Sequence, residues 1–110
     1  MERFVKGEVI VLPFPYTDLS TIKKRPALVI ATLRGQNIIL AQITTVKRKD
    51  EGLVSLIKKD FETGFLKQAS FIMPSIISTA ESSTVSYKVG KIKQEKIKEV
   101  EKKLCEIFTR

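Results

Sequence analysis

The hydrophobic pattern of the chain consists of short β-type segments followed by one helical segment. Runs rich in valine, isoleucine and leucine, separated by polar, glycine or proline positions, predict strands over 9–12, 27–32, 38–45, 53–57, 70–77 and 85–89. Arg34-Gly35-Gln36-Asn37 joins the second and third of these as a hairpin turn. The segments 13–25 and 58–68 are expected to be a loop and an irregular connection, and Pro74 is expected at an edge or a bulge.

After Gln94 the spacing of apolar residues changes from the strand period to the helical one. Ile97, Val100 and Leu104, followed by Ile107 or Phe108, recur at three- and four-residue intervals, with lysines and glutamates between them. Because the strands do not alternate with helices, a doubly wound parallel sheet is not expected. The pattern predicts a mainly β domain over residues 1–110, a small bent sheet or barrel closed by one C-terminal helix.

The chain is strongly basic, and this favours a polyanionic partner. Its formal net charge is +8 and its pI about 9.8, and much of the excess lies in Lys23-Lys24-Arg25 and Lys47-Arg48-Lys49. Nucleic acid is the natural partner for such a surface, the alternative being a surface made basic only for solubility. No apolar run approaches the roughly 18 residues that a membrane span requires.

The inventory of reactive side chains restricts the chemistry. The chain has no histidine and one cysteine, Cys105, so neither an internal disulfide nor a cysteine zinc cage is expected. This usage fits the reducing cytoplasm, and the N-terminus lacks the pattern of a secretory signal. An enzyme with this inventory would use arginine, lysine, serine, threonine, tyrosine or carboxylates, and no metal or other cofactor is expected.

The sequence around Arg25-Pro26 indicates an anion site. Proline is tolerated at the first residue of a strand, and it holds the preceding arginine extended. With a two-residue loop at Gly35-Gln36, Arg25 lies opposite Val46, and Thr44 lies diagonally across on the same face; a three-residue loop would reverse this. A guanidinium and a hydroxyl that converge in this way can bind phosphate.

The same pairing would merge the two basic triplets into one patch. The alternative is that basic loops merely flank a hairpin and that Thr44 fills a β-branched position in it.

Three segments resemble the MazF/PemK family of toxin endoribonucleases. They are "KGEVIVLPFPYTDLSTIKKRPALVI", "AQITT" and "GFLKQASFIMPSIIST", in that order and followed by a closing helix. Gly7, Pro13, Phe14 and Arg25-Pro26 match the most specific part of the pattern. The resemblance implies an SH3-like barrel of the CcdB/PemK type, a homodimer, metal-independent cleavage of single-stranded RNA, and an antitoxin partner whose inhibitory segment is expected to be acidic.

The resemblance also implies roles for individual residues. Arg25 matches the catalytic arginine, Thr44 the catalytic threonine, and Ser70 a recurring serine with a supporting role. The chain departs from the pattern at Ser20, where some relatives carry a glutamate, and at Lys93, where the family has serine or threonine at the start of the helix.

The remaining candidate residues are assigned to RNA binding. Backbone phosphates are expected on Lys23, Lys24, Lys47, Arg48 and Lys49, and the same RNA-binding set includes Tyr16, Ser20 and Ser70. Tyr16 or Phe14 would stack a base, although core packing is the preferred role for Phe14. Two other functions stay open, a protein-binding toxin of the gyrase-poisoning CcdB kind and a non-catalytic nucleic-acid-binding barrel.

Overall fold

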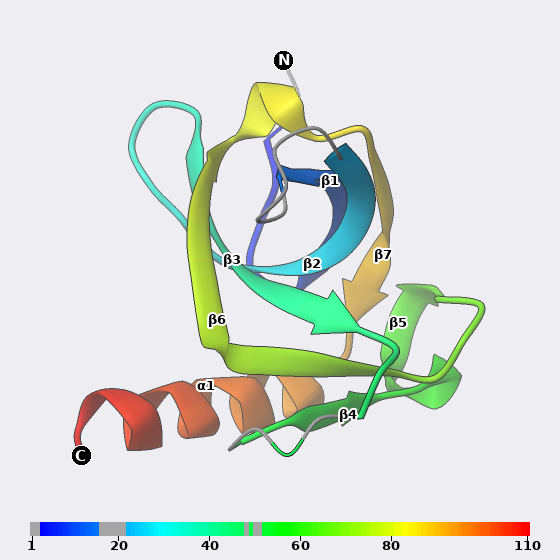
Figure 1. The fold of residues 1–110 in the computed structure, drawn as a ribbon, viewed down its shortest axis with the longest axis vertical. Helices are drawn as coiled ribbons and strands as arrows, with labels where there is room; N and C mark the ends of the chain where they lie inside the picture. Colours follow the sequence, from blue (N-terminus) through cyan, green and yellow to red (C-terminus); the bar gives the residue numbers. More distant parts are fainter. Residues whose placement is uncertain (1–2, 16–21, 48, 50–51) are drawn as a thin grey trace.

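The computed structural model describes residues 3–15, 22–47, 49 and 52–110, which form one curled antiparallel sheet and one helix (Figure 1). The sheet has seven strands in the order β4-β6-β3-β2-β1-β7-β5. The strands are β1 Glu8–Pro15, β2 Ile22–Thr32, β3 Asn37–Thr44, β4 Val54–Leu56, β5 Phe61–Gly64, β6 Ser70–Glu81 and β7 Tyr87–Ile92, with short 3₁₀ turns η1 Lys58–Asp60 and η2 Ser82–Thr84. The helix α1 runs from Gln94 to Phe108. The predicted mainly β fold, an SH3-like barrel with a C-terminal helix, is confirmed.

Apolar residues on the two faces of the curled sheet form two separate cores. One core packs against α1 through Ile97, Val100 and Leu104, as the helical spacing predicted. The other core contains Phe4 from the N-terminal segment. Phe108 is 71% exposed, so the helical stripe ends at the partly buried Ile107. In the described part of the chain, no helix is long and apolar enough to cross a membrane.

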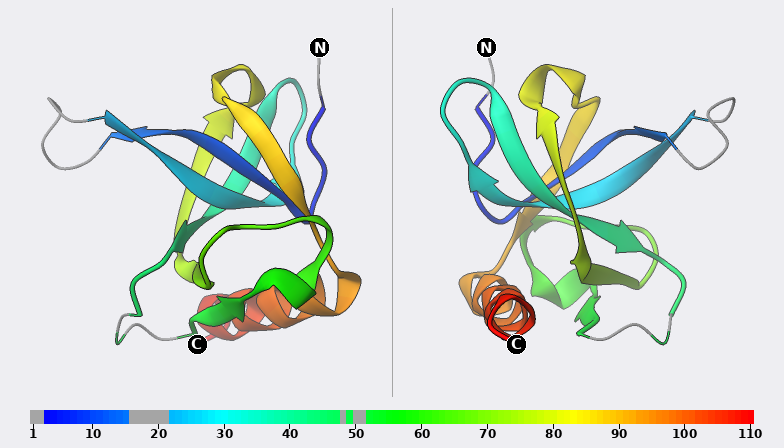
Figure 2. Two further views of the ribbon diagram at one scale, coloured as in Figure 1. Left: turned by 90° about the vertical axis from the view of Figure 1, so that its right-hand side faces the viewer. Right: turned by 60° about the vertical axis from the view of Figure 1, so that its left-hand side comes forward.

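Strands β1 and β2 are longer than predicted. The expected loop after residue 12 is largely strand, because β1 continues to Pro15 and β2 already begins at Ile22. These extensions pair with each other as a two-stranded ribbon that projects from the body of the sheet (Figure 2). Pro13, Lys23 and Lys24 in this ribbon are exposed, and its sequence lacks the regular alternation by which strands are recognised.

The other strands differ from the prediction in smaller ways. The segment expected to be irregular contains β5, Phe61–Gly64, and β7 begins at Tyr87 and ends at Ile92 rather than covering 85–89. The strand predicted over 70–77, β6, continues to Glu81. The register of the β3–β6 pair shifts where Met73 and Ile77 pair with consecutive residues of β3, which confirms the bulge expected at Pro74.

Pro26 lies in the middle of β2, and the prediction that it begins the strand is wrong. The carbonyl oxygen of Val11 accepts a hydrogen bond of 2.8 Å from the Ser86 N–H on the β7 side, so the backbone groups of Leu12 point toward β2. Arg25 is the partner of Leu12, so its backbone N–H and C=O groups point toward β1. The backbone of Pro26, the next residue, consequently points toward β3. The pairing of β2 with β3 ends at Ala27, the residue that follows Pro26, because proline has no N–H to continue it.

Candidate functional site

The sheet opens between β2 and β3, and the two principal candidate residues lie on the two sides of this opening. Beyond Ala27, β2 stays paired with β1 through Arg25 and Leu12. On the other side, β3 stays paired with β6 through Thr44 and Phe71. The two branches diverge from this point, as both views of Figure 2 show. Arg25 therefore lies on one branch of the sheet and Thr44 on the other.

The turn that connects β2 and β3 is not the predicted two-residue loop. The Leu33 N–H donates to the Asn37 carbonyl oxygen at 2.9 Å, which leaves residues 34–36 as a three-residue loop. Taken alone, such a loop would place Arg25 and Thr44 on opposite faces of the hairpin. A shift of the pairing register by one residue moves every side chain of a strand to the other face of the sheet, relative to its partner strand.

A bulge in β2 reverses the orientation a second time. The register of the β2–β3 pair shifts at Ile30, so that Ala27 pairs with Gln42. Alternate residues of a strand share a face, so Arg25 lies on the face of Ala27 and Thr44 on that of Gln42. The two side chains therefore face the same side of the sheet, two residues beyond the last pair of the ladder.

The polar groups at the opening are suited to an anion. Arg25 is exposed, and Thr44 is partly buried with its Oγ1 atom 3.1 Å from the backbone nitrogen of Val46, whose N–H donates to it. A hydroxyl has one donor and two lone pairs, so this bond orients Thr44 while its own proton remains able to donate. A guanidinium presents a fork of N–H donors. Both side chains therefore carry donors of the kind that bind phosphate oxygens.

The basic residues flank the opening but do not form the single patch that was predicted. Lys23 and Lys24 are exposed on the β1–β2 ribbon, and Lys47 and Lys49 are exposed after the end of β3. Because the ladder ends before these segments, they lie on diverging branches of the sheet. Arg48, the remaining member of the second triplet, lies outside the described residues.

Three other candidates lie away from Arg25 and Thr44 or outside the described residues. Ser70 is 3% exposed and its hydroxyl donates to the Gln68 carbonyl oxygen at 2.9 Å, a bond that holds the start of β6. Ser70 directly precedes Phe71, the partner of Thr44, and neighbouring residues of a strand lie on opposite faces. The Ser70 side chain therefore lies on the face of the sheet opposite to Thr44. Tyr16 and Ser20 lie outside the described residues.

Phe14 packs against the core cluster that contains Phe4, in agreement with the preferred core role for this residue.

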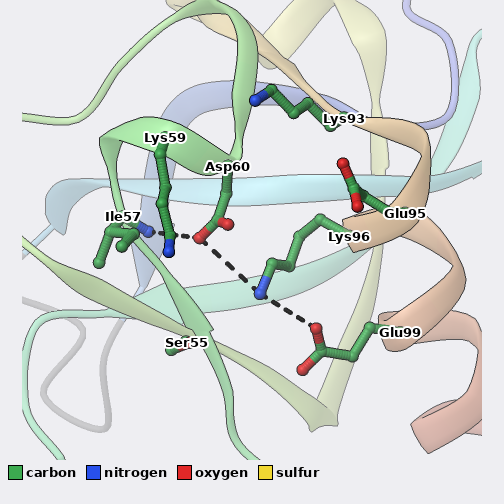
Figure 3. A pocket seen from close by; sticks show the side chains of 8 residues that line it. All are labelled: Ser55, Ile57, Lys59, Asp60, Lys93, Glu95, Lys96 and Glu99. Atoms are coloured by element: carbon green, nitrogen blue, oxygen red, sulfur yellow. Dashed lines mark hydrogen bonds and ion pairs between the residues drawn. The ribbon is translucent and has the colours of Figure 1, made fainter.

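A charged pocket of about 570 Å³ lies between β4, η1 and the start of α1 (Figure 3). Its Lys96, whose side chain is 12% exposed, lies 3.7 Å from the Asp60 carboxylate and 3.0 Å from that of Glu99. Asp60 also accepts the Ile57 N–H at 2.8 Å, and its carbonyl oxygen accepts the Lys93 N–H at 2.8 Å. These bonds fasten the loop before β5 to the helix, so the pocket is a structural junction. Among the described residues, no group of three potential metal ligands occurs.

A second hollow of about 570 Å³, which we call the rear groove, was not predicted from the sequence. It lies on the face of β1 and β2 opposite to Arg25 and is lined by Val11, Lys24, Pro26, Phe65, Leu66, Lys67, Tyr87 and Val89. The only signal in the sequence is an aromatic residue close to a lysine in two separate segments, 65–67 and 87–88. Nothing in either segment indicates that folding brings them together.

The fold and the site define a small SH3-like barrel whose sheet opens between an arginine and a threonine, with exposed lysines on both branches. The chain belongs to the PemK-like, MazF-like toxins of type II toxin–antitoxin systems, whose family model matches residues 5–108. The resemblance seen in the sequence is thus confirmed. No curated protein sequence matches the chain.

Solved structures of MazF toxins share the fold at low sequence identity. The Mycobacterium tuberculosis toxin MazF-mt6 superposes with a TM-score of 0.74 at 16% identity, over 93% of this chain and 96% of that one. A mycobacterial endoribonuclease in complex with its cognate antitoxin gives 0.78 at 13% identity, over 97% and 96%. MazE–MazF from Deinococcus radiodurans gives 0.75 at 15% identity, over 96% and 95%. These likenesses establish the architecture.

Proposed function

We propose that this toxin is a metal-independent, sequence-specific endoribonuclease that cleaves single-stranded RNA, in particular mRNA. The observation that carries the proposal is the placement of Arg25 and Thr44 on one face of the sheet, on the two branches that diverge between β2 and β3. Membership of the MazF-like toxins supports it, as does the fold shared with mycobacterial endoribonucleases. The absence of histidine from the sequence favours a reaction in which the RNA supplies its own nucleophile.

The proposed reaction is attack by a ribose 2′-hydroxyl on the adjacent phosphorus. A bond forms between O2′ and phosphorus, the bond to the 5′-oxygen of the next nucleotide breaks, and the products are a 2′,3′-cyclic phosphate and a free 5′-hydroxyl. The 2′-hydroxyl loses a proton and the leaving oxygen gains one. Positioning of the reacting groups and stabilisation of the negative phosphorane lower the barrier.

Arg25 is proposed to stabilise the charge that develops on the phosphorane, with Thr44 orienting the phosphate through its hydroxyl. Arginine is a poor general base because its guanidinium stays protonated in proteins. Its contribution to catalysis is therefore electrostatic, and it acts through the guanidinium fork.

The proposal extends to the partners of the toxin. Lys23 and Lys24 on one branch, with Lys47 to Lys49 on the other, would hold RNA phosphates on both sides of the cut. The protein would act in the cytoplasm as a homodimer, and a cognate antitoxin with an acidic segment would inhibit it. A segment of that charge competes with RNA for the same cations, so its affinity should fall as salt rises.

We expect purified protein to cleave a long single-stranded RNA at defined short sequences in the presence of EDTA. Primer extension maps the cut positions, and 3′ ends that resist alkaline phosphatase until acid opens the ring identify the cyclic phosphate. A preparation of Arg25→Ala purified in parallel controls for contaminating ribonucleases. Activity that disappears in EDTA and returns with magnesium would contradict the mechanism, and an inert protein would favour the protein-binding alternative of the CcdB kind.

Neutralising the second basic segment should weaken RNA binding without changing the cut sequence. For Lys47→Gln with Lys49→Gln, the slope of log K against log salt should fall by about 1.4, because each contact with a single strand contributes about 0.7. The matched control is Lys98→Gln with Lys102→Gln, two exposed lysines on α1 that remove the same charge elsewhere. An altered base preference in the first variant would mean that this segment reads sequence instead.

A further inference from the structure

The rear groove lies directly behind the strand that carries Arg25. Val11 pairs with Pro26 on one side and with Tyr87 on the other, so these three residues share a face and form the floor and one wall. Lys24 alternates with Arg25 along β2 and therefore occupies the groove side of the strand. Residues 65–67, which follow β5, form the opposite wall. The groove is thus built from three parts of the chain that are distant in sequence.

The groove exposes apolar side chains that globular proteins usually bury. Tyr87 is 57% exposed and Phe65 is 51% exposed. Two cations, Lys24 and Lys67, line the same hollow, and the Nζ atom of Lys58 lies 5.1 Å from the centre of the Phe65 ring. Aromatic rings within a cationic groove are the combination by which proteins bind single-stranded nucleic acid, because bases stack on the rings while lysines hold phosphates.

The edge of β2 provides a route from the opening to the groove. From Ala27 toward the N-terminal end of β2, the side of the strand that faces β3 has no partner strand among the described residues, and Pro26 offers no N–H there. A nucleic-acid strand that meets Arg25 on one face can therefore pass over this edge without displacing a strand. On the other face it meets Lys24 first, the neighbour of Arg25 in the chain.

We propose that the rear groove is a nucleotide-binding subsite for RNA that flanks the cleaved bond. A base stacks on Tyr87 and Phe65, and the neighbouring phosphates contact Lys24 and Lys67. This inference rests on the proposed ribonuclease function and extends it, since it assigns a second stretch of the substrate to a surface separate from Arg25 and Thr44. A volume of about 570 Å³ is in the range of pockets that hold small ligands, which suits one nucleotide better than a folded partner.

The test is the binding of a fluorescein-labelled single-stranded RNA dodecamer that contains a mapped cut site. All proteins carry Arg25→Ala so that the RNA stays intact during the titration. Adding Tyr87→Leu should weaken binding about tenfold or more, the effect expected for loss of one stacked base. Tyr87→Phe, which keeps the ring, should stay within about twofold. Phe108→Leu removes a more exposed ring from the end of α1 and should also stay within about twofold.

The outcomes separate this inference from the proposed function. Wild-type protein that neither binds nor cleaves RNA overturns both. Wild-type cleavage together with unchanged binding by Tyr87→Leu overturns the subsite alone. If Tyr87→Leu loses affinity for an acidic antitoxin peptide while RNA binding is unchanged, the groove belongs to that partner. If the variant instead dissociates a dimer in sedimentation, the groove belongs to a second copy of the chain. Each of these results also overturns the proposal. Thermal melts of every variant verify that it is folded.

Discussion

We expect Arg25→Ala to slow RNA cleavage by about 100-fold or more, the loss usual for removing one preorganised donor that stabilises developing charge. Arg25 is exposed, and its side chain lies on the same face of the sheet as that of Thr44. Single-turnover cleavage of a short RNA with a mapped site measures the chemical step apart from product release. A fall in the rate constant with little change in RNA affinity would locate the effect in the transition state.

Two further variants test the role assigned to the guanidinium. Arg25→Lys should recover little activity, because an ammonium group is a point charge without the planar fork of donors. Thr44→Ala should reduce the rate without lowering the melting temperature appreciably, since the hydroxyl accepts only one bond, from the exposed Val46 N–H.

The matched control is Arg34→Ala, which removes an equally exposed arginine from the turn between β2 and β3. Cleavage by this variant should stay within about twofold of wild type. Wild-type rates for Arg25→Ala would place the catalytic site elsewhere on the molecule.

The elements predicted from the sequence are those that bury one face. The apolar runs in β1, β2, β3 and β6 and the helical stripe of Ile97, Val100 and Leu104 are visible in the sequence because the cores require them. Hydrophobic periodicity records burial, and it therefore locates buried strands well.

The elements missed in the sequence are stabilised by neighbours that periodicity does not record. The β1–β2 ribbon exposes Lys23 and Lys24, and β5 has one buried residue, Phe61. Both depend on pairing with a partner strand, and in a single sequence nothing identifies that partner.

The pairing register of β2 and β3 near Arg25 and Thr44 also could not be predicted from the hydrophobic pattern. Arg25 and Thr44 share a face as expected, but they do so through a three-residue loop whose effect is reversed by the bulge at Ile30. A one-residue insertion in one strand has no signature in an apolar run, so neither irregularity was predicted. The rear groove was not predicted because segments 65–67 and 87–89 come together only through the antiparallel pairing of β5 with β7.

We expect alanine at Gly64 or Gly90 to destabilise the fold strongly. The two glycines pair where β5 crosses β7, and their backbones lie too close to admit a side chain. A Cβ atom on Gly90 would fall on the carbonyl oxygen of Thr63, and one on Gly64 would fall on that of Val89. Gly64 also has a φ of 73°, a conformation that side chains disfavour.

The size of the effect follows from these two contributions. A β-carbon forced against backbone costs about 1–3 kcal/mol, and a non-glycine residue in the left-handed region costs roughly 1–2 kcal/mol more. Gly90→Ala should therefore lower the free energy of unfolding by about 2 kcal/mol, and Gly64→Ala by about 3 to 4 kcal/mol. At roughly 4–8 °C per kcal/mol, the melting temperature should fall by about 8–16 °C for Gly90→Ala and by about 12–32 °C for Gly64→Ala.

Gly35→Ala is the matched control, because Gly35 has nearly the same φ, 74°, and no atom within 4 Å of its added Cβ. It should lose only the conformational contribution, about 1 kcal/mol. Chemical denaturation of the three variants then separates crowding from backbone strain. Equal losses for Gly64→Ala and Gly35→Ala would mean that the backbones of β5 and β7 do not approach closely. Residues 65–67 would then not be held against Tyr87, and the rear groove would lose the wall that Phe65 and Lys67 supply.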